Sequence, residues 1–375
     1  MIKIAILGAG MVGRAIALDL ARDFSVSSFD LNQNNLDLLQ SRNSSVETIH
    51  KDLSQFHDYA NWLAPYDIIV TAVPGFMGFE TLKAVINCGK NVADISFFPE
   101  DVLQLDALAR NKKVTVITDI GVAPGMSNLI LGRYNEEMIV TNFECYVGGL
   151  PQDPRPPFFY KAPFSPIDVI EEYTRPARLK EHGRIVEKPA LTEREIMEFD
   201  GVGKLEAFNT DGLRSLLFTM PHIPDMKEKT LRYPGHLDLI LALKDAGFFD
   251  EKEIAIKGIK VSPLAFTAQV LIGEWKLGVE EEELTVMRVI VEGKAEGESR
   301  RIEYNLLDKY DPVTKTSSMS RTTGYTCAAA VHLIAKNLFT EIGIFPPERI
   351  GKDKGCFDFI TGYLKERGVF WKIKS

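Results

Sequence analysis

The sequence predicts an α/β protein with a doubly wound parallel sheet followed by a second α+β domain built on a largely antiparallel sheet. Three observations predict this fold class. Short apolar segments alternate with segments of helical spacing over the first 120 residues. A glycine-rich turn directly follows the first apolar segment. Beyond residue 120, strand-like segments continue without regular crossover helices.

The amino-terminal part alternates between strands and helices. Val12, Ile16 and Leu20 recur every four residues, as expected for one face of a helix. Near-continuous apolar strands in a β-α alternation are typical of a parallel sheet covered on both faces. Six segments are predicted strands: 2–7, 25–29, 46–49, 68–72, 91–93 and 114–117.

The later part has a different pattern. Segment 148–157 is rich in proline and is predicted to be a loop. Further strands are predicted at 141–147, 185–187, 195–199, 205–208, 285–292 and 300–305, and helices at 211–218, 236–246 and 324–338. We therefore expect a dinucleotide-binding domain over residues 1–120, a substrate and dimerisation domain over 121–320, and a carboxyl-terminal segment, 321–375, that packs back on the first domain.

Composition excludes several classes of protein. The net charge of −8 argues against a nucleic-acid binder, whose surface would be basic. No apolar run approaches the roughly 18 residues of a membrane-spanning helix, so we expect no membrane contact. The four cysteines and six histidines show no metal-ligand spacing, and no metal is expected. With no signal-peptide pattern at the amino terminus, a cytoplasmic protein is the expectation.

The strongest motif is the run Gly8-Ala9-Gly10-Met11-Val12-Gly13, placed between a strand and an amphipathic helix. In this GxGxxG pattern the glycines allow a tight turn, a close approach of backbone to a diphosphate, and close packing of helix on strand. The free N–H groups at the helix N-terminus attract the phosphates. The motif predicts a Rossmann-type dinucleotide site that includes Gly8, Gly10, Met11, Val12 and Gly13. The alternative is a sheet whose glycine turn binds nothing.

Asp30 ends the second strand, 22 positions after Gly8, and indicates which dinucleotide binds. Its carboxylate suits the two ribose hydroxyls of NAD, whereas a 2′-phosphate would meet a like charge. That repulsion is about 4 kcal/mol at about 4 Å and a dielectric of about 20, before screening. No arginine follows Asp30, so NAD is favoured over NADP. Further expected cofactor contacts, each with a plain turn as the alternative, are Leu31, Asp52, Leu53, Ala72, Val73 and Pro74.

Two later motifs suggest a family. Gly121-Val122-Ala123-Pro124-Gly125-Met126 follows the sixth strand, and Tyr146-Val147-Gly148-Gly149-Leu150-Pro151 ends the next. With the amino-terminal glycine motif, these resemble the saccharopine dehydrogenase family, and within it the NAD-dependent lysine 6-dehydrogenases. Shorter pieces around 206–215, 231–236 and 343–348 extend the resemblance over essentially the whole chain.

The resemblance implies NAD-dependent oxidative deamination of the ε-amine of L-lysine, with a small amino-acid substrate and a homodimer. Saccharopine reductases of the family carry an acidic residue where this chain has Ala123, which weakens the expectation of saccharopine as substrate. The alternatives are a dehydrogenase or reductase of saccharopine or a carboxyalkyl polyamine precursor, and a non-catalytic NAD-binding sensor.

Amine oxidation requires a general base. Hydride leaves the ε-carbon only from the neutral amine, and with a pKa near 10.4 that form costs about 4.6 kcal/mol at about pH 7. Asp94 and Asp119 are the candidate bases, because they lie at the carboxyl ends of the fifth and sixth strands, where ligands bind in such sheets. Capping of the turn that follows each aspartate is the alternative.

A substrate carboxylate requires a guanidinium partner. By the motifs that resemble the family, Arg214 and Arg232 are the candidates, with ordinary salt bridges as the alternative. Tyr146 and Gly149 are expected to line the substrate cleft, unless they only end a strand. His236 is a candidate proton relay, against the commoner case of a buried or solvent-facing histidine with no catalytic role.

Overall fold

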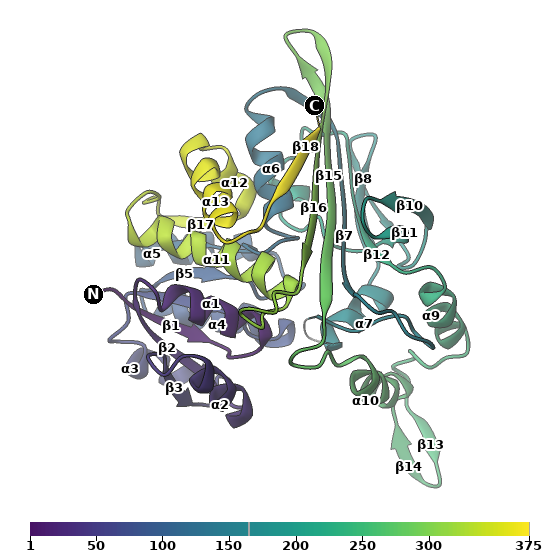
Figure 1. Cartoon of the computed structure of the whole chain (residues 1–375), viewed down its shortest axis with the longest axis horizontal. Coiled ribbons are helices and arrows are strands. Elements are labelled where there is room, and N and C mark those ends of the chain that lie inside the picture. The colour runs from purple at the N-terminus through teal and green to yellow at the C-terminus, as the bar shows by residue number, and fades with distance from the viewer. Residues whose placement is uncertain (164–165, 375) are drawn as a thin grey trace.

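A parallel sheet forms the amino-terminal domain of the computed structural model (Figure 1). Within residues 1–163 and 166–374, which the structure describes, it has seven strands in the order β17-β6-β5-β4-β1-β2-β3. Their bounds are β1 Lys3–Leu7, β2 Ser25–Asp30, β3 Glu47–His50, β4 Ile68–Thr71, β5 Asn91–Asp94, β6 Thr115–Ile117 and β17 Gly343–Phe345. The predicted fold class is confirmed.

Helices cover both faces of this sheet, and β1 shows why. Ile4 and Ile6 belong to one buried cluster, whereas the alternate residues Ala5 and Leu7 belong to another on the opposite face. Because side chains alternate along a strand, only a strand buried on both sides is apolar at every position. The helices packed here are α1 Met11–Leu20, α2 Gln33–Arg42, α3 Tyr59–Trp62, α4 Gly75–Asn87, α5 Asp106–Lys112, α12 Pro347–Gly351 and α13 Lys354–Glu366.

The second sheet is mixed and largely antiparallel. In the described part of the chain it has nine strands, with the path β10-β11-β12-β7-β15-β16-β18, with β8 paired to β12 and with β9 paired to β8. Only the β7–β12 pair is parallel among these described pairings. The strands are β7 Ile139–Pro151, β8 Ala177–Glu181, β9 Arg184–Lys188, β10 Glu195–Phe199, β11 Gly203–Asn209, β12 Asp225–Arg232, β15 Glu283–Ala295, β16 Glu298–Lys309 and β18 Trp371–Lys374.

Shorter elements surround this sheet. A separate hairpin projects from the body next to α10 (Figure 1). These elements are α6 Met126–Asn135, α7 Pro166–Thr174, α8 Leu216–Thr219, α9 His236–Asp245, β13 Ile254–Ile256, β14 Ile259–Val261 and α10 Pro263–Trp275.

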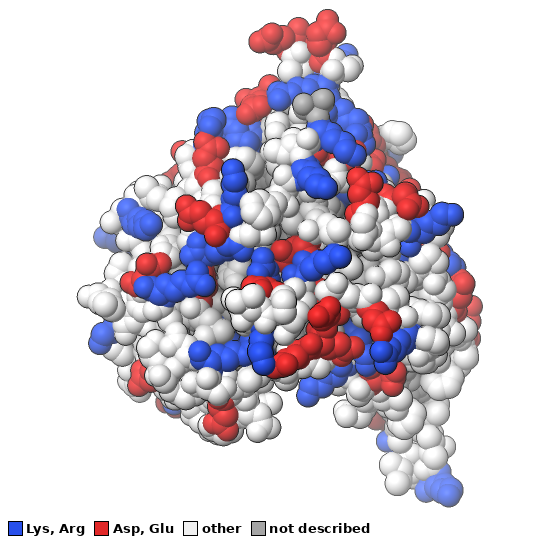
Figure 2. All heavy atoms as spheres, viewed as in Figure 1, with Lys and Arg blue, Asp and Glu red and all other residues white. Residues whose placement is uncertain are grey.

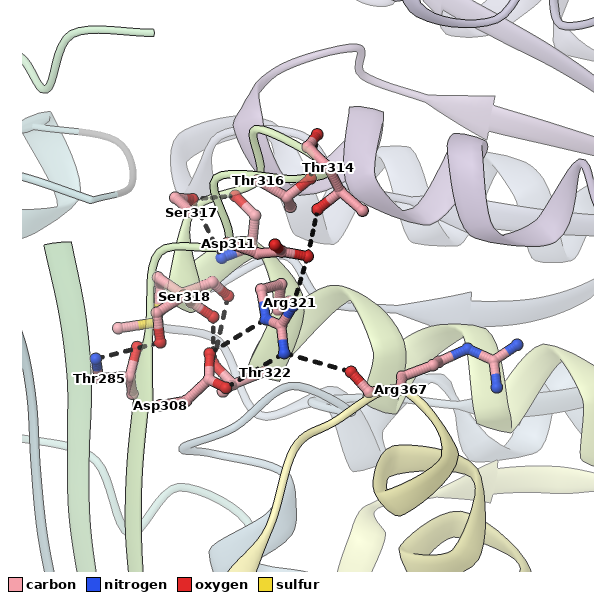
Figure 3. A network of polar contacts seen from close by, with 12 residues as sticks. Thr285, Asp308, Asp311, Thr314, Thr316, Ser317, Ser318, Arg321, Thr322 and Arg367 are labelled. Atoms are coloured by element: carbon pink, nitrogen blue, oxygen red, sulfur yellow. Dashed lines mark hydrogen bonds and ion pairs between the residues drawn. The ribbon is translucent and has the colours of Figure 1, made fainter. Parts of the chain in front are cut away.

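Helix α11, Ser318–Ala335, joins the two domains and is buried over nearly its whole length. Its side chains share one core with β1 and with β15 and β16, and Gly324 packs against Ile16 of α1. Arg321 ties the start of the helix to the second sheet and to the chain end (Figure 3). It donates to Asp308 (Nε–Oδ2 3.2 Å), to Asp311 (Nη1–Oδ2 3.1 Å) and to the Arg367 carbonyl (Nη2–O 3.2 Å).

The carboxyl-terminal segment contributes to both sheets. Strand β17 extends the first sheet beside β6, and β18 pairs with β16 of the second sheet. The last helices pack on the first domain, where Tyr363 of α13 donates to Asp19 of α1 (Oη–Oδ2 2.5 Å). The segment expected to pack on the first domain therefore lies on that domain through α11 to α13 and returns to the second through its final strand.

Two sequence-based expectations were wrong. The helix predicted at 211–218 is reduced to α8, because Asp211 accepts a hydrogen bond from Arg178 (Nη2–Oδ2 2.8 Å) and Arg214 has a φ of +47°, incompatible with a helix. The loop predicted from residue 148 instead begins after Pro151, because residues 148–151 pair with β15. The local proline count did not reveal this long-range pairing.

No helix among the described residues is long and apolar enough to cross a membrane. Acidic and basic side chains are intermixed over the face of the molecule shown in Figure 2.

A candidate active-site cleft between the domains

A cleft of about 1180 Å³ runs along the carboxyl-terminal edge of the parallel sheet. Its walls come from the glycine turn and the β4–α4 turn on one side, and from β7, β12 and the start of α11 on the other. Every cofactor residue predicted from the sequence lines it: Gly8, Gly10, Met11, Val12, Gly13, Asp30, Leu31, Asp52, Leu53, Ala72, Val73 and Pro74.

The glycine turn has the geometry of a diphosphate cradle. A Cβ on Gly8 would lie 2.3 Å from the Ala72 carbonyl oxygen, and one on Gly13 would lie 2.0 Å from the Gly8 oxygen. These two glycines are therefore required for packing. Gly10 has no heavy atom within 4 Å of such a Cβ and faces the cleft at the N-terminus of α1. The open space and the unpaired helix N–H groups fit a dinucleotide diphosphate.

Asp30 has a structural role in addition to its predicted contact with ribose. Its Oδ2 accepts a hydrogen bond from the Ala9 amide of the glycine turn (2.7 Å), and its Oδ1 accepts one from the Asn32 amide (2.7 Å). The side chain of Asn35 also donates to Oδ2 (3.3 Å). Oδ1 has a further lone pair for a ligand hydroxyl, so the same aspartate shapes the turn and faces the cleft.

Asp119 and Arg214 bind each other. Their two contacts, Oδ1–Nη2 at 3.0 Å and Oδ2–Nε at 3.1 Å, form a two-pronged ion pair, and Arg214 also donates to the Phe98 carbonyl. Asp119 lines the cleft, whereas Arg214 lies behind it. This pairing orients Arg214 toward Asp119 and away from a substrate carboxylate in the cleft.

Asp94 lies beneath the cleft surface and is fully buried. Its Oδ1 accepts hydrogen bonds from Thr71 (Oγ1, 2.6 Å) and from the Ser96 amide (3.1 Å), which is the capping arrangement considered as the alternative. Burial raises its pKa to about 7. The structure thus brings Asp119 to the cleft wall and keeps Asp94 below it.

Arg232 reaches the cleft but is fully engaged. It donates to Glu172 (Nη2–Oε2 2.6 Å), to the Tyr173 hydroxyl (Nε–Oη 3.0 Å) and to the Leu231 carbonyl (Nη1–O 2.9 Å). Tyr173 also contacts Nε2 of His236 at 2.9 Å. Burial and the charge of Arg232 lower the pKa of His236 to about 3, so this histidine is neutral at physiological pH and does not line the cleft.

Gly149 and Tyr146 lie on opposite sides of β7. Gly149 lines the cleft, where a Cβ would lie 2.4 Å from Cγ of Pro163. Tyr146 points into a separate apolar cluster, and its hydroxyl donates to Glu144 (Oη–Oε2 2.8 Å). Because side chains alternate between the two faces of a strand, Gly149 and Tyr146, which are three residues apart, face opposite sides.

Sequence reasoning missed a buried carboxylate in the cleft wall. Glu228 of β12 lines the cleft and is 6% exposed, and no described residue donates a hydrogen bond to its carboxylate. Burial, with the charges of Glu172 and Asp211, raises its pKa to about 8. A Cβ on Gly212 would lie 1.7 Å from Oε2 of Glu228, so the glycine makes room for this side chain. Strand β12 lacks an apolar alternation that would have signalled it.

No group of three or more metal-binding side chains occurs among residues 1–163 and 166–374. The cleft offers glycine-turn amides, arginines of which Arg175 and Arg232 are paired with glutamates, and the buried carboxylate of Glu228 as its chemical groups.

Comparison with known proteins identifies the family. Residues 4–117 match the model of the saccharopine dehydrogenase NADP binding domain, and residues 121–369 match that of the saccharopine dehydrogenase C-terminal domain. The chain belongs to the saccharopine dehydrogenase family. The boundary between the two matches lies at the end of the parallel sheet's first six strands, close to the boundary expected at residue 120.

Curated relatives in this family have low sequence identity to this chain and are longer than it. Saccharopine dehydrogenase [NADP(+), L-glutamate-forming] of Schizosaccharomyces pombe is 26% identical over 204 residues, which cover 50% of this chain and 45% of that protein. The Saccharomyces cerevisiae protein of the same name is 25% identical over 275 residues, or 68% of this chain and 61% of that protein. The chain thus matches less than half the length of the first of these relatives.

Solved structures share the fold along the whole chain. Apo saccharopine dehydrogenase (L-Glu forming) from Saccharomyces cerevisiae has a TM-score of 0.80 at 20% identity, with 100% of this chain and 99% of that one covered. Homospermidine synthase from Legionella pneumophila, solved with NAD, has a TM-score of 0.70 at 12% identity, with 100% and 91% covered.

Proposed function

We propose that this chain catalyses the NAD-dependent oxidative deamination of the ε-amine of L-lysine, forming 2-aminoadipate 6-semialdehyde, ammonia and NADH. The observation that carries the proposal is Glu228, a buried and unpaired carboxylate in the wall of the dinucleotide cleft. The curated relatives, named as saccharopine dehydrogenases, support oxidation at a carbon that bears nitrogen.

The charge of the second-domain wall favours a cationic amine. Glu172 and Asp211 line it together with Glu228, and the first two are paired with Arg232 and Arg178. Glu228 alone of the three forms no ion pair among the described residues, so an arriving ammonium group supplies a direct partner for its charge. An ammonium buried beside a carboxylate is compensated, whereas either charge alone is costly to bury.

Glu228 then acts as the general base. Its ionised carboxylate takes one proton from the ε-ammonium, which leaves a neutral amine whose lone pair can form the C=N bond. Because its pKa is raised to about 8, Glu228 is a better match for the amine proton than an ordinary glutamate. A bound NAD supplies the acceptor for the hydride from the ε-carbon. Water adds to the resulting imine, and ammonia leaves with the aldehyde as the other product.

The α-carboxylate of lysine requires a cation that is more accessible than Arg232. Of the two guanidinium groups that line this half of the cleft, Arg175 is 21% exposed and Arg232 only 3%. Arg175 pairs with Glu171 at the cleft wall and stacks over Phe97. We assign to it the single α-carboxylate of lysine.

A secondary amine such as saccharopine is the second candidate, favoured by the names of the relatives. Its additional dicarboxylate arm needs further cations, but Arg232 and Arg214 are only 3% and 5% exposed and are paired with Glu172 and Asp119. Ala123, which lines the cleft, provides no carboxylate for its secondary amine.

The test is absorbance at 340 nm when the purified protein is mixed with NAD and either lysine or saccharopine. Formation of NADH with lysine, and ammonia in equal amount, supports the proposal. Turnover with saccharopine alone supports the second candidate, and tight NAD binding without turnover of any amine supports a non-catalytic sensor.

A further inference from the structure

A pair of threonine hydroxyls lies beside Glu228 in the second-domain wall of the cleft. Thr230 is two residues after Glu228 on β12, and both line the cleft because alternate side chains of a strand face the same side. Thr210, which also lines the cleft, follows the end of β11. Its amide lies 3.5 Å from the Glu228 carbonyl oxygen, so the pairing of β11 with β12 continues to this point. Three polar side chains from two neighbouring strands therefore form one patch on the wall.

Among the described residues, the two hydroxyls form a hydrogen bond to each other and to no other group. Thr210 Oγ1 and Thr230 Oγ1 are 3.0 Å apart, and the two residues are 4% and 5% exposed. A hydroxyl donates one hydrogen bond and accepts two, so the shared bond uses only one of the two protons. One O–H donor and several lone pairs remain for a molecule in the cleft. Because the pair carries no charge, a small neutral polar ligand satisfies it better than an ion.

The proposed reaction requires such a ligand at this place. After the hydride has left, the ε-carbon of lysine belongs to an iminium group, and a water molecule must reach it. A buried water needs about two to four polar partners. Side chains two residues apart on a strand start about 6.5 Å apart, and a water with a hydrogen bond of about 2.8 Å on each side spans that gap. We infer that the Thr210–Thr230 pair and Glu228 together hold the water that attacks the ε-carbon of the imine.

The bonds made and broken in this step assign a task to each group. Glu228 first releases to solvent the proton that it took from the ammonium. The water oxygen then bonds to the ε-carbon, one electron pair of the C=N bond returns to nitrogen, and one water proton passes to Glu228. The C–N bond breaks next: Glu228 gives this proton to the nitrogen, which leaves as ammonia, and accepts the hydroxyl proton as the aldehyde forms.

The threonine pair exchanges no proton in this sequence. It accepts a hydrogen bond from the second O–H of the water and so keeps a lone pair of the water oxygen directed at the carbon. The inference rests on the proposed deamination of lysine, and it adds the groups that control the hydrolytic half of that reaction.

The experiment separates hydride transfer from hydrolysis in the native protein and two variants. Thr210→Val and Thr230→Val replace a hydroxyl by a methyl group of similar size, and stopped-flow absorbance at 340 nm follows NADH after mixing with NAD and lysine. We expect the first NADH per site to form within about twofold of the native rate and the steady rate that follows to fall by about tenfold, the effect of one lost hydrogen bond. With lysine deuterated at the ε-carbon, the isotope effect on the steady rate should be smaller in the variants than in the native enzyme.

A chemical trap identifies the species that accumulates. Sodium cyanoborodeuteride, added after the first turnover, reduces an iminium group to an amine. Mass spectrometry should therefore find lysine with one added deuterium in the variants and less of it in the native enzyme. Fluorescence titration with NADH, which needs no turnover, should give the same affinity for all three proteins and shows that the cofactor site is intact.

Two further variants serve as controls. Thr285→Val removes a hydroxyl from a buried threonine of the same sheet that does not line the cleft, and it should leave both phases unchanged. Thr230→Ser keeps the hydroxyl and should recover most of the steady rate. Equal losses in the two phases of the valine variants, or no loss in either, would overturn this inference and leave the proposed reaction standing. A native protein that forms no NADH with lysine would overturn the proposed reaction and this inference with it.

Discussion

The carboxylate of Asp119 holds the guanidinium of Arg214 at 3.0 and 3.1 Å, with both side chains at most 5% exposed. The pair closes the base of the cleft between the end of β6 and the segment before α8. Two residues that sequence patterns suggested for separate roles, a base and a carboxylate ligand, thus satisfy each other. The role of general base passes in our proposal to Glu228.

Breaking this pair should destabilise the fold. Arg214→Ala leaves the Asp119 carboxylate buried without its cation, and we expect a loss of about 3–5 kcal/mol in the free energy of unfolding. Urea denaturation measures it. Arg155→Ala is the matched control, since Arg155 and its partner Asp153 are 81% and 73% exposed, and its cost should stay below about 1 kcal/mol. Equal losses in the two variants would show that the buried pair contributes no more than a surface pair.

Glu228→Gln should remove the general base without disturbing the cleft wall. The amide has the same shape as the acid but cannot take a proton, so we expect kcat for lysine oxidation to fall by about 10²–10⁴-fold. In the native enzyme kcat/KM should rise as pH increases through about 8, where Glu228 ionises. Steady-state rates from pH 6 to 10 measure both effects. A variant that retains this inflection would assign it to another group.

Stability should depend on pH through Asp94. Because burial raises its pKa to about 7, the folded state holds this proton more tightly than the unfolded chain, whose aspartate pKa is about 3.9. The resulting stabilisation is complete below about pH 4 and is lost as pH rises to about 7. Asp94→Asn, which does not titrate, should gain stability relative to the native protein over that interval. Thermal unfolding at pH 5 and pH 8 tests this, and a constant difference between the two proteins would contradict it.

Substitutions at two glycines of the turn should affect dinucleotide binding and stability separately. Gly10→Ala places its Cβ in open space at an ordinary backbone φ of −61°, so the fold should persist while dinucleotide affinity falls by tenfold or more, about 1.4 kcal/mol. Gly13→Ala places its Cβ 2.0 Å from the Gly8 oxygen and should lower the melting temperature. Calorimetry and fluorescence titration measure the two properties. Unchanged dinucleotide affinity in Gly10→Ala would show that this position does not face the diphosphate.

The residues of the predicted dinucleotide site could be identified from the sequence because the patterns that mark them are short. The strand before Gly8, the helix that begins at Met11 and the position of Asp30 at the end of β2 are all set within the first 30 residues. Parallel strands then bring their carboxyl ends to one edge, so that the turns around Asp52 and Ala72 meet there without further information.

The sequence by itself determined the parallel sheet, the glycine turn and its cofactor edge, since short-range periodicity and backbone geometry dictate them. Only the tertiary structure decided how charges are paired in the cleft. Glu228 has no ionic partner because Arg232 and Arg178 are paired with Glu172 and Asp211. Whether a charged group finds a partner depends on residues that are far away in the sequence. Local sequence patterns do not show which distant residues come together in the fold.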